Sequence, residues 1–281
     1  MSVRTTTRRR QLGAMLRKFR ARKGMTLEEA GGLVGVSKAT VSRYETQAGP
    51  VKWIVVDALC REYGATDAER EAVVRLAKDT RQRGWWNSFA DSIPESMNLL
   101  LTLEDEAVRE DHFACVYVPG LLQTRAYSTA LQRANEIPLE PAEIERLVDI
   151  RMKRQDILTR PKPPRLWAIL DESVIRRVVG APETMREQLD RLLEANESPH
   201  ITLQVLPFSK GAHCAALGSF VILGGTESAL DVVYVDFHTG SLFLEQEDEL
   251  DRYRLAFQYL CAQALDMEAS SALIHRVRKE L

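Results

Sequence analysis

Residues 26–45 read TLEEAGGLVGVSKATVSRYE, and two helix-start signals stand close together in this stretch. Thr26 and Glu29 have the Thr-x-x-Glu spacing of a capping box, in which each side chain accepts a hydrogen bond from the other residue's backbone N–H. Ser37 is expected to cap a second short helix. Gly35 can adopt a positive φ at little cost, so a tight turn fits between the two helices. The stretch therefore predicts a helix-turn-helix.

The second helix of this motif, residues 38–45, is expected to have one apolar side and one polar side. Val41 and Tyr44 have the spacing of core residues on a helix. The side chains left facing outward are Lys38, Ala39, Thr40, Ser42 and Arg43. A short polar helix face with a long cation at each end is suited to the major groove of DNA, where side chains reach base edges.

Helices on both sides of the motif complete a predicted all-α unit of five helices, residues 1–82. Leu12, Leu16 and Phe19 recur at helical spacing and place one face of a helix over residues 8–23 in the core. Further helices are predicted over 51–63 and 67–80. Gly31 is expected where the two helices of the motif cross, because a side chain there would push them apart.

The charge of the chain is divided unevenly along its length. Residues 1–50 hold eleven Lys or Arg and three acids, a formal charge of +8. The remaining residues hold 27 basic and 37 acidic side chains, a formal charge of −10. A basic head on an acidic body is typical of a nucleic-acid-binding module joined to a part that must not bind DNA.

The segment LEEAGGLVGVSKATVSRYE (27–45) resembles the helix-turn-helix of XRE/Cro-like, phage-repressor-type regulators, whose usual form ends in G-V-S-x-x-x-[VI]-S-x-[IYW]-E. The resemblance implies that the second helix of the motif, residues 38–45, contacts base edges. It also implies that helix N-termini contact phosphates and that residues 47–52 contact the DNA backbone. We expect Arg43 to make a bidentate guanine contact. The implied DNA-binding residues are Thr26, Ser37, Lys38, Ala39, Thr40, Ser42, Arg43, Gln47 and Lys52. Ala30 and Gly32 depart from the usual form, and a glycine within a helix costs about 1 kcal/mol relative to alanine.

Residues 83–281 alternate helical segments with β-branched runs, which predicts an α+β domain with a largely antiparallel sheet. Strands are predicted over 113–118, 166–170, 201–206, 219–223, 231–236 and 241–244. Helices are predicted over 124–134, 141–159, 184–195, 248–265 and from 270 onward. The acidic run 245–249 is expected to begin a helix, where carboxylates are favourable, and Trp85–Trp86 is expected to be buried.

Four segments of this part, VPGLLQT (118–124), R-x-x-R-Q (151–155), LDESVIRRVVG (170–180) and QVLPFSKGAH…GSF (204–220), resemble a domain of unknown function common in actinobacterial helix-turn-helix regulators. Regulators of this kind are similar to antitoxins, and developmental control of the WhiJ type is a recurrent role. The resemblance implies a small partner protein encoded by a neighbouring gene. It assigns no reaction to the domain.

Other functional classes receive little support from the sequence. The four cysteines lie far apart and form no C-x-x-C pair, so we expect no metal site and no disulfide framework. Asp171, Glu172, Arg176, Arg177 and His213 could form a polar pocket, but no nucleophile elbow or phosphate-binding loop accompanies them, and we expect no cofactor and no catalysis. Asp171 and Glu172 are expected instead to bind backbone N–H groups in a loop or at a helix start. The sequence has neither a signal peptide nor an apolar membrane helix, which predicts a cytoplasmic protein.

Three functional hypotheses follow. The first is a homodimeric, sequence-specific regulator, expected to be a repressor, that binds a pseudo-palindromic operator in double-stranded DNA. Its C-terminal domain would receive a signal from a small partner protein or ligand. The second is an antitoxin-like protein that sequesters a small partner protein and regulates its own gene. The third, an enzyme fused to a DNA-binding domain, lacks any recognisable catalytic motif.

Overall fold

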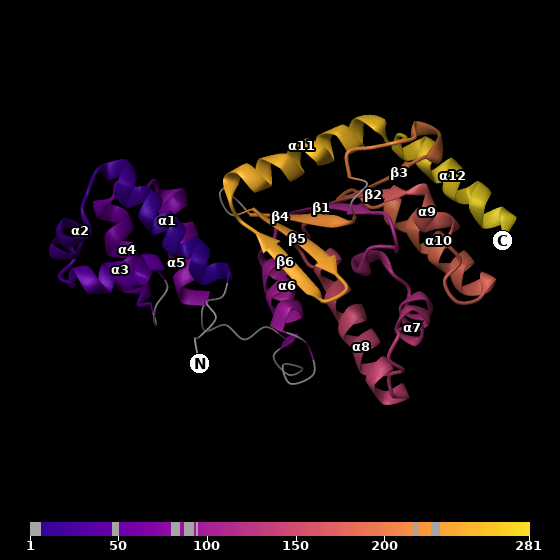
Figure 1. Cartoon of the computed structure of the whole chain (residues 1–281), viewed down its shortest axis with the longest axis horizontal. Coiled ribbons are helices and arrows are strands. Elements are labelled where there is room, and N and C mark those ends of the chain that lie inside the picture. Colours follow the sequence, from indigo (N-terminus) through magenta and orange to yellow (C-terminus); the bar gives the residue numbers. More distant parts are fainter. Residues whose placement is uncertain are drawn as a thin grey trace. The chain divides into compact units, whose positions relative to one another are not determined.

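The computed structural model describes residues 7–46, 51–79, 85–86, 93, 95–215, 218–225 and 231–281. The chain divides into two compact units, Met1–Leu99 and Leu100–Leu281. Figure 1 shows the helices of the first unit and the sheet of the second. The predicted domain boundary between residues 82 and 83 lies outside the described residues and stays a prediction.

The N-terminal unit begins with five helices, as predicted. They are α1 (Thr7–Lys23), α2 (Leu27–Leu33), α3 (Lys38–Thr46), α4 (Trp53–Glu62) and α5 (Asp67–Asp79). Leu12, Leu16 and Phe19 are buried on one face of α1, and Val41 of α3 is fully buried as well. The apolar spacing in the sequence therefore identified the core of this unit.

The C-terminal unit is built on a six-stranded mixed sheet with the order β3-β2-β1-β4-β5-β6. Its strands are β1 (Arg109–Ala114), β2 (Arg165–Asp171), β3 (Ile201–Leu206), β4 (Phe220–Gly224), β5 (Val232–Phe237) and β6 (Gly240–Leu244). β1, β2 and β3 pair in parallel. The pairs β1–β4, β4–β5 and β5–β6 are antiparallel. The prediction of an α+β domain with a largely antiparallel sheet is confirmed.

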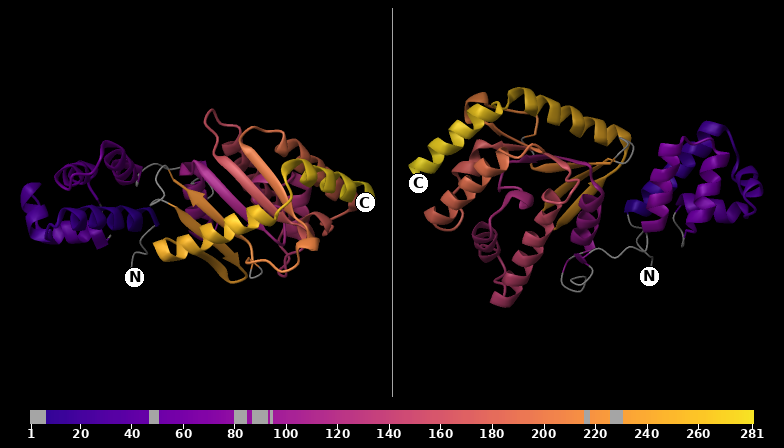
Figure 2. Two further views of the ribbon diagram at one scale, coloured as in Figure 1. Left: turned by 90° about the horizontal axis from the view of Figure 1, so that it is seen from above. Right: turned by 180° about the vertical axis from the view of Figure 1, so that it is seen from behind.

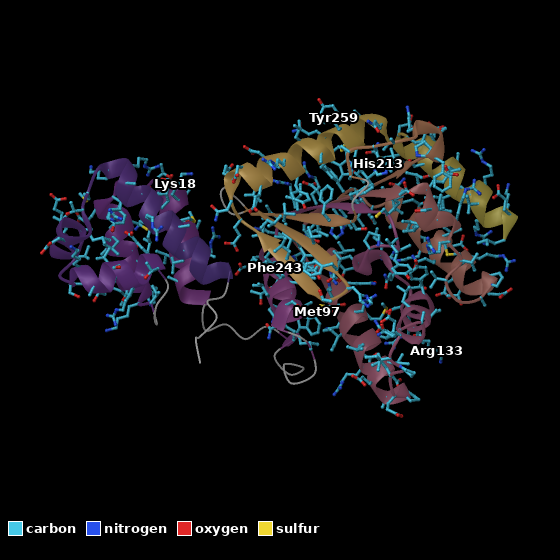
Figure 3. All side chains as sticks on the ribbon, viewed as in Figure 1. Lys18, Met97, Arg133, His213, Phe243 and Tyr259 are labelled. Atoms are coloured by element: carbon cyan, nitrogen blue, oxygen red, sulfur yellow. The ribbon has the colours of Figure 1, made fainter. Side chains whose placement is uncertain are left out.

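Helices cover both faces of this sheet (Figure 2). They are α6 (Glu95–Glu106), α7 (Arg125–Arg133), α8 (Pro141–Arg154), α9 (Glu172–Arg176), α10 (Pro182–Asn196), α11 (Glu247–Gln263) and α12 (Met267–Glu280). Helix α11 packs on one face through Leu250, Phe257 and Leu260. Helices α7, α10 and α12 share a second core on the other face. Tyr259 projects from the side of α11 turned away from the sheet (Figure 3). Leu255, one helical turn before it, is exposed as well.

Strand β1 corrects the prediction of a strand over 113–118, because it runs from Arg109 to Ala114. Its first four residues, Arg-Glu-Asp-His, are polar and gave no strand signal in the sequence. In the structure they lie in the middle of the sheet with their charges matched. Arg109 Nε donates to Asp111 Oδ2 at 2.9 Å, and His112 Nε2 lies 2.8 Å from Glu110 Oε2. Pairing between neighbouring side chains of the strand therefore offsets the cost of burying its polar groups.

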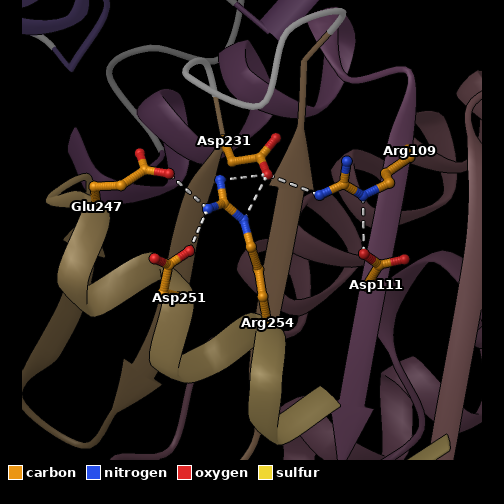
Figure 4. A network of polar contacts seen from close by, with 6 residues as sticks. All are labelled: Arg109, Asp111, Asp231, Glu247, Asp251 and Arg254. Atoms are coloured by element: carbon orange, nitrogen blue, oxygen red, sulfur yellow. Dashed lines mark hydrogen bonds and ion pairs between the residues drawn. The ribbon is translucent and has the colours of Figure 1, made fainter. Parts of the chain in front are cut away.

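A larger ion network ties α11 to the same strand (Figure 4). Asp231 is fully buried, and its Oδ2 accepts hydrogen bonds from Arg109 Nη2 at 2.8 Å and from Arg254 Nη2 at 2.9 Å. Arg254 Nη1 also donates to Glu247 and Asp251, each at 2.9 Å. The acidic run begins α11 as predicted, and in addition it holds the arginine that anchors this helix to the sheet.

Three further differences concern helices. The sequence gave no prediction for α6 and indicated α9 only as a loop or helix start at Asp171 and Glu172. The helix predicted over 141–159 ends as an α-helix at Arg154 and is followed by a 3-10 turn over Gln155–Leu158. Asp171 and Glu172 behave as predicted. The Asp171 carboxylate caps α9 by accepting a hydrogen bond from Ser173 N, and Glu172 Oε2 accepts one from Phe208 N. Trp86 is buried, as expected, whereas Trp85 is only half-buried. None of the described helices is long and apolar enough to cross a membrane.

The buried pair Glu110 and His112 determines a pH dependence of stability. Burial raises the pKa of Glu110 from 4.5 to about 7 and lowers the pKa of His112 from 6.5 to about 4. The stability contributed by Glu110 is therefore lost as the pH rises from 4.5 through 7. The stability contributed by His112 is lost as the pH falls from 6.5 through 4. The two dependences oppose each other between these limits.

Single substitutions should separate these two dependences. Glu110→Gln removes the dependence of Glu110, so between pH 7 and pH 5 the free energy of unfolding of the C-terminal unit should fall by more than in the wild type. His112→Gln removes the dependence of His112, so its change should differ from the wild type in the opposite direction. The buried Glu104, whose pKa is also raised to about 7, titrates in all three proteins, so each variant is compared with the wild type. Urea denaturation at both pH values measures the changes. Differences from the wild type that have the same sign in the two variants would contradict this account.

Candidate nucleic-acid interface

The predicted capping box at the start of α2 is present in the structure. Glu29 N donates to Thr26 Oγ1 at 3.2 Å, and Thr26 N donates to Glu29 Oε2 at 2.8 Å. The hydrogen bond from the Thr26 backbone lowers the pKa of Glu29, so its carboxylate stays charged at neutral pH. Since Thr26 Oγ1 also donates to this carboxylate at 2.9 Å, the threonine hydroxyl is exposed but already engaged in the cap.

The turn between α2 and α3 depends on two glycines. Gly35 has a φ of +70°, a left-handed conformation that favours glycine. A Cβ on Gly31 would lie 2.5 Å from the Val36 carbonyl oxygen and close to the backbone of Ser37 and Lys38. Gly31 therefore allows the close crossing that the sequence predicted, and this crossing sets the angle at which α3 leaves α2.

A row of three hydrogen-bonded polar residues runs along the outer side of α3. Ser37 Oγ accepts from Thr40 N at 3.2 Å and lies 3.0 Å from Thr40 Oγ1. Arg43 Nη2 in turn donates to Thr40 Oγ1 at 3.2 Å. Residues three apart on a helix are neighbours on one face, so this polar row presents a hydroxyl, a hydroxyl and a guanidinium on the same side. Arg43 is exposed and contacts no carboxylate in the described part of the chain.

The other predicted residues of α3 surround this row. Ala39 is exposed and Ser42 is half-buried, while Thr46 Oγ1 donates to the Ser42 carbonyl oxygen at 2.7 Å. The side chain of Lys38 is 63% exposed, and its Nζ is 4.0 Å from Glu28 Oε2. A pair this long and this exposed constrains the lysine little, so Lys38 can reach a phosphate or a base.

Lys52 stands immediately before α4, at some distance along the chain from α3. Its backbone N donates to Tyr44 Oη at 3.2 Å, and its side chain is exposed. The buried tyrosine of α3 thus fixes where the chain enters α4. Gln47 lies outside the described residues. The structure brings Ser37, Thr40 and Arg43 together in one row and locates Thr26 and Lys52 at the N-terminal ends of neighbouring helices.

A buried ion pair that the sequence reasoning did not find supports α3 from behind. Glu45 accepts hydrogen bonds from Arg20 Nε at 2.6 Å and Nη2 at 2.8 Å. Arg20 also donates from Nη1 to the Met25 carbonyl oxygen at 2.8 Å, and hydrogen bonding to Glu45 raises the pKa of Arg20. The helix-turn-helix motif of the sequence ends in glutamate, and this residue, Glu45, lies on the core side of α3. Its position in the motif is therefore the sequence signal that could have indicated the pair.

The residues of the polar pocket considered for the C-terminal unit are engaged in other contacts. His213 Nε2 is 3.9 Å from Asp171 Oδ2, which is too long for a hydrogen bond. Asp171 is engaged in capping α9, and Glu172 is paired with Arg176. Across the described ranges no group of three His, Cys, Asp or Glu side chains could hold a metal ion. The exposed polar row on α3 is therefore the stronger candidate site.

Comparisons with known proteins agree with this division of the chain. A family model described as a helix-turn-helix domain matches residues 11–73, which include α2, α3 and all the predicted DNA-binding residues. A second model, described as a domain of unknown function (DUF5753), matches residues 97–276. Searches of curated proteins and of solved structures gave no significant match.

Proposed function

The chain belongs to the family of the domain of unknown function DUF5753, with a helix-turn-helix domain preceding that domain, and we propose that it is a sequence-specific transcriptional repressor that responds to a signal. The helix-turn-helix domain supports DNA binding and transcription regulation. The observation that carries the proposal is the exposed polar row Ser37–Thr40–Arg43 on α3, in the part of the chain with a charge of +8. Such a helix can enter the major groove and read base edges.

Each predicted residue that the structure describes has a role in this proposal. Arg43 donates two hydrogen bonds to a guanine, and Thr40 orients it through the contact already present. Ser37 and Thr26 stand at helix N-termini, where backbone N–H groups favour a phosphate. Lys38 and Lys52 neutralise phosphates on either side, and Ala39 and Ser42 face bases from the same helix.

We propose that the protein binds a pseudo-palindromic operator as a homodimer, so that two copies of α3 reach half-sites one helical turn apart. Leu33 of α2 and Ile54 of α4 are large apolar side chains exposed on the N-terminal unit. Their exposure supports a protein contact by this unit, since apolar surface of this kind is favourable to bury. The C-terminal unit would then receive the signal, from a small partner protein or from a ligand.

The proposal is tested by substituting the arginine that reads DNA. We expect Arg43→Ala to weaken binding to the preferred duplex by about 1–3 kcal/mol and to relax the choice of base at one position, because the bidentate contact is lost. Fluorescence anisotropy with duplexes that carry each base at that position measures both effects. Arg75→Ala, an exposed arginine on α5, is the matched control and should leave the base preference unchanged. Unaltered preference in Arg43→Ala would contradict the assigned role.

An antitoxin-like function is the alternative, and one observation favours it. Leu255 and Tyr259 are one helical turn apart on the outer side of α11, and both are more than half exposed. A small partner protein that covered these side chains would be held by the C-terminal unit, with DNA binding used for autoregulation. Copurification with the product of a neighbouring gene, lost in Tyr259→Asp, distinguishes this alternative from a ligand-responsive repressor.

A further inference from the structure

Helix α8 of the C-terminal unit (Figure 1) carries an arginine, Arg151, that no carboxylate of the described residues contacts. Arg151 and Arg154 are three residues apart and therefore neighbours on one side of this helix. The Glu104 carboxylate holds Arg154 through two hydrogen bonds. Arg151 has no such partner among the residues that the structure describes, and its one hydrogen bond runs from Nη1 to Gln123 Oε1 at 2.7 Å. Arg154 is thus paired with a carboxylate, whereas Arg151 contacts only a neutral amide.

The amide that contacts Arg151 is fixed in its orientation. Gln123 is buried, and its Nε2 donates to the Val118 carbonyl oxygen at 2.6 Å, which leaves Oε1 to accept from the arginine. Gln155 Nε2 donates to the Gly120 carbonyl oxygen at 2.9 Å and to the Gln123 carbonyl oxygen at 2.8 Å. These bonds fasten the segment before α7 to the end of α8. The neutral amide orients the guanidinium but cannot neutralise it.

The surroundings of Arg151 are unfavourable for a lone cation. Burial and, to a smaller extent, the charge of Arg154 lower the pKa of Arg151 to about 10. Asp236 and Tyr234 on β5 and Tyr127 on α7 face the group and act in the opposite direction. Arg151 stays charged at neutral pH, yet it is only half-buried, so a solute can reach it. A half-buried charge that no described carboxylate contacts directly costs free energy that a bound anion would recover.

Two of the segments that resemble the family converge at this point. VPGLLQT supplies Gln123, and R-x-x-R-Q supplies Arg151, Arg154 and Gln155. The DNA interface uses none of these residues, since they belong to the other compact unit. Their mutual hydrogen bonds build a rigid setting around one unneutralised guanidinium, which is the arrangement of a preformed anion site.

We propose that Arg151 binds the carboxylate or phosphate group of a small ligand of the C-terminal unit. A planar guanidinium donates two parallel hydrogen bonds to either oxyanion, and this geometry gives specificity as well as affinity. The signalling role of this site rests on the proposed function, because only a regulator would couple the ligand to DNA binding. The binding itself does not depend on DNA.

Thermal unfolding of the full-length protein tests the site. Inorganic phosphate and succinate are titrated separately, with NaCl at the same ionic strength as the reference. We expect at least one of them to raise the melting temperature of the C-terminal unit; the one that does identifies the oxyanion. Arg151→Met should abolish the shift, whereas Lys153→Gln should keep it, because Lys153 lies on the same helix but is well exposed. A wild-type protein that responds to neither anion, or an Arg151→Met variant that responds fully, would overturn the proposal.

A second variant covers the case in which Arg151→Met does not fold. Arg151→Lys keeps the charge but cannot form the two-point contact, so the affinity for the responsive anion should fall about tenfold. Unchanged affinity in this variant counts against the site. Operator affinity with and without the anion is measured separately by anisotropy. An anion that binds without altering operator affinity refutes the proposed signalling while the site stands, and an anion that does not bind refutes the site while DNA binding stands.

Discussion

Replacing Glu45 by alanine is expected to destabilise the N-terminal unit by about 3 kcal/mol. The side chain of Glu45 is 3% exposed and that of Arg20 is 17% exposed, so both ends of the pair are largely removed from water. Truncation leaves the guanidinium with only the Met25 carbonyl oxygen as a partner. An uncompensated buried charge costs more than the pair itself contributes.

The same carboxylate offers a matched control. Arg17 Nε is 3.9 Å from Glu45 Oε2, and the Arg17 side chain is 59% exposed. An exposed pair of this length contributes between zero and about 1 kcal/mol. Arg17→Ala should therefore have nearly the same free energy of unfolding as the wild type. Circular dichroism during urea denaturation at neutral pH measures both variants. Equal losses of stability in Glu45→Ala and Arg17→Ala would show that Arg20 and Glu45 do not act as a buried pair.

The second large effect is expected at the crossing of α2 and α3. Alanine at position 31 would place its Cβ 2.5 Å from the Val36 carbonyl oxygen, a backbone atom that cannot move without shifting α3. Overpacking of this kind costs about 1–3 kcal/mol, and we expect the upper end because the obstacle is backbone. The row Ser37–Thr40–Arg43 would also lose its orientation, so DNA affinity should fall by more than the loss of folded protein explains.

Gly32, the next residue, provides the control for Gly31. A Cβ at position 32 meets no atom within 4 Å, and alanine is the better helix former by about 1 kcal/mol. Gly32→Ala should therefore raise the melting temperature of the N-terminal unit while Gly31→Ala lowers it. Differential scanning calorimetry of the two variants gives the comparison. Shifts of the same sign would mean that the crossing of the two helices is not as close as the structure has it.

Local signals explain what the sequence predicted well. Thr26 and Glu29 form the capping box that their spacing indicated, and Val41 is buried as its position on α3 required. These features depend on residues within one or two helical turns, where the sequence contains the whole interaction. The outward polar row on α3 follows from the same periodicity, although its hydrogen bonds through Thr40 do not.

The features that the sequence missed depend on partners far along the chain. Strand β1 begins with four polar residues, and only their contacts with Asp231 and with each other make them fit a central strand. Glu45 pairs with Arg20 on α1, which is 25 residues away in the sequence. The hydrogen-bond partner of Arg151 is the neutral amide of Gln123, which is 28 residues away. No periodicity or motif spacing reports such long-range pairing, because the fold alone brings the groups together.

The central claim is that α3 reads DNA sequence, and one measurement tests it most directly. Full-length protein is used to select duplexes from a random library, and its affinities for the selected duplex and for a shuffled duplex of the same composition are compared at physiological salt. We predict a selected duplex bound about 10³-fold more tightly than the shuffled one. Equal affinity for the two duplexes would contradict the account.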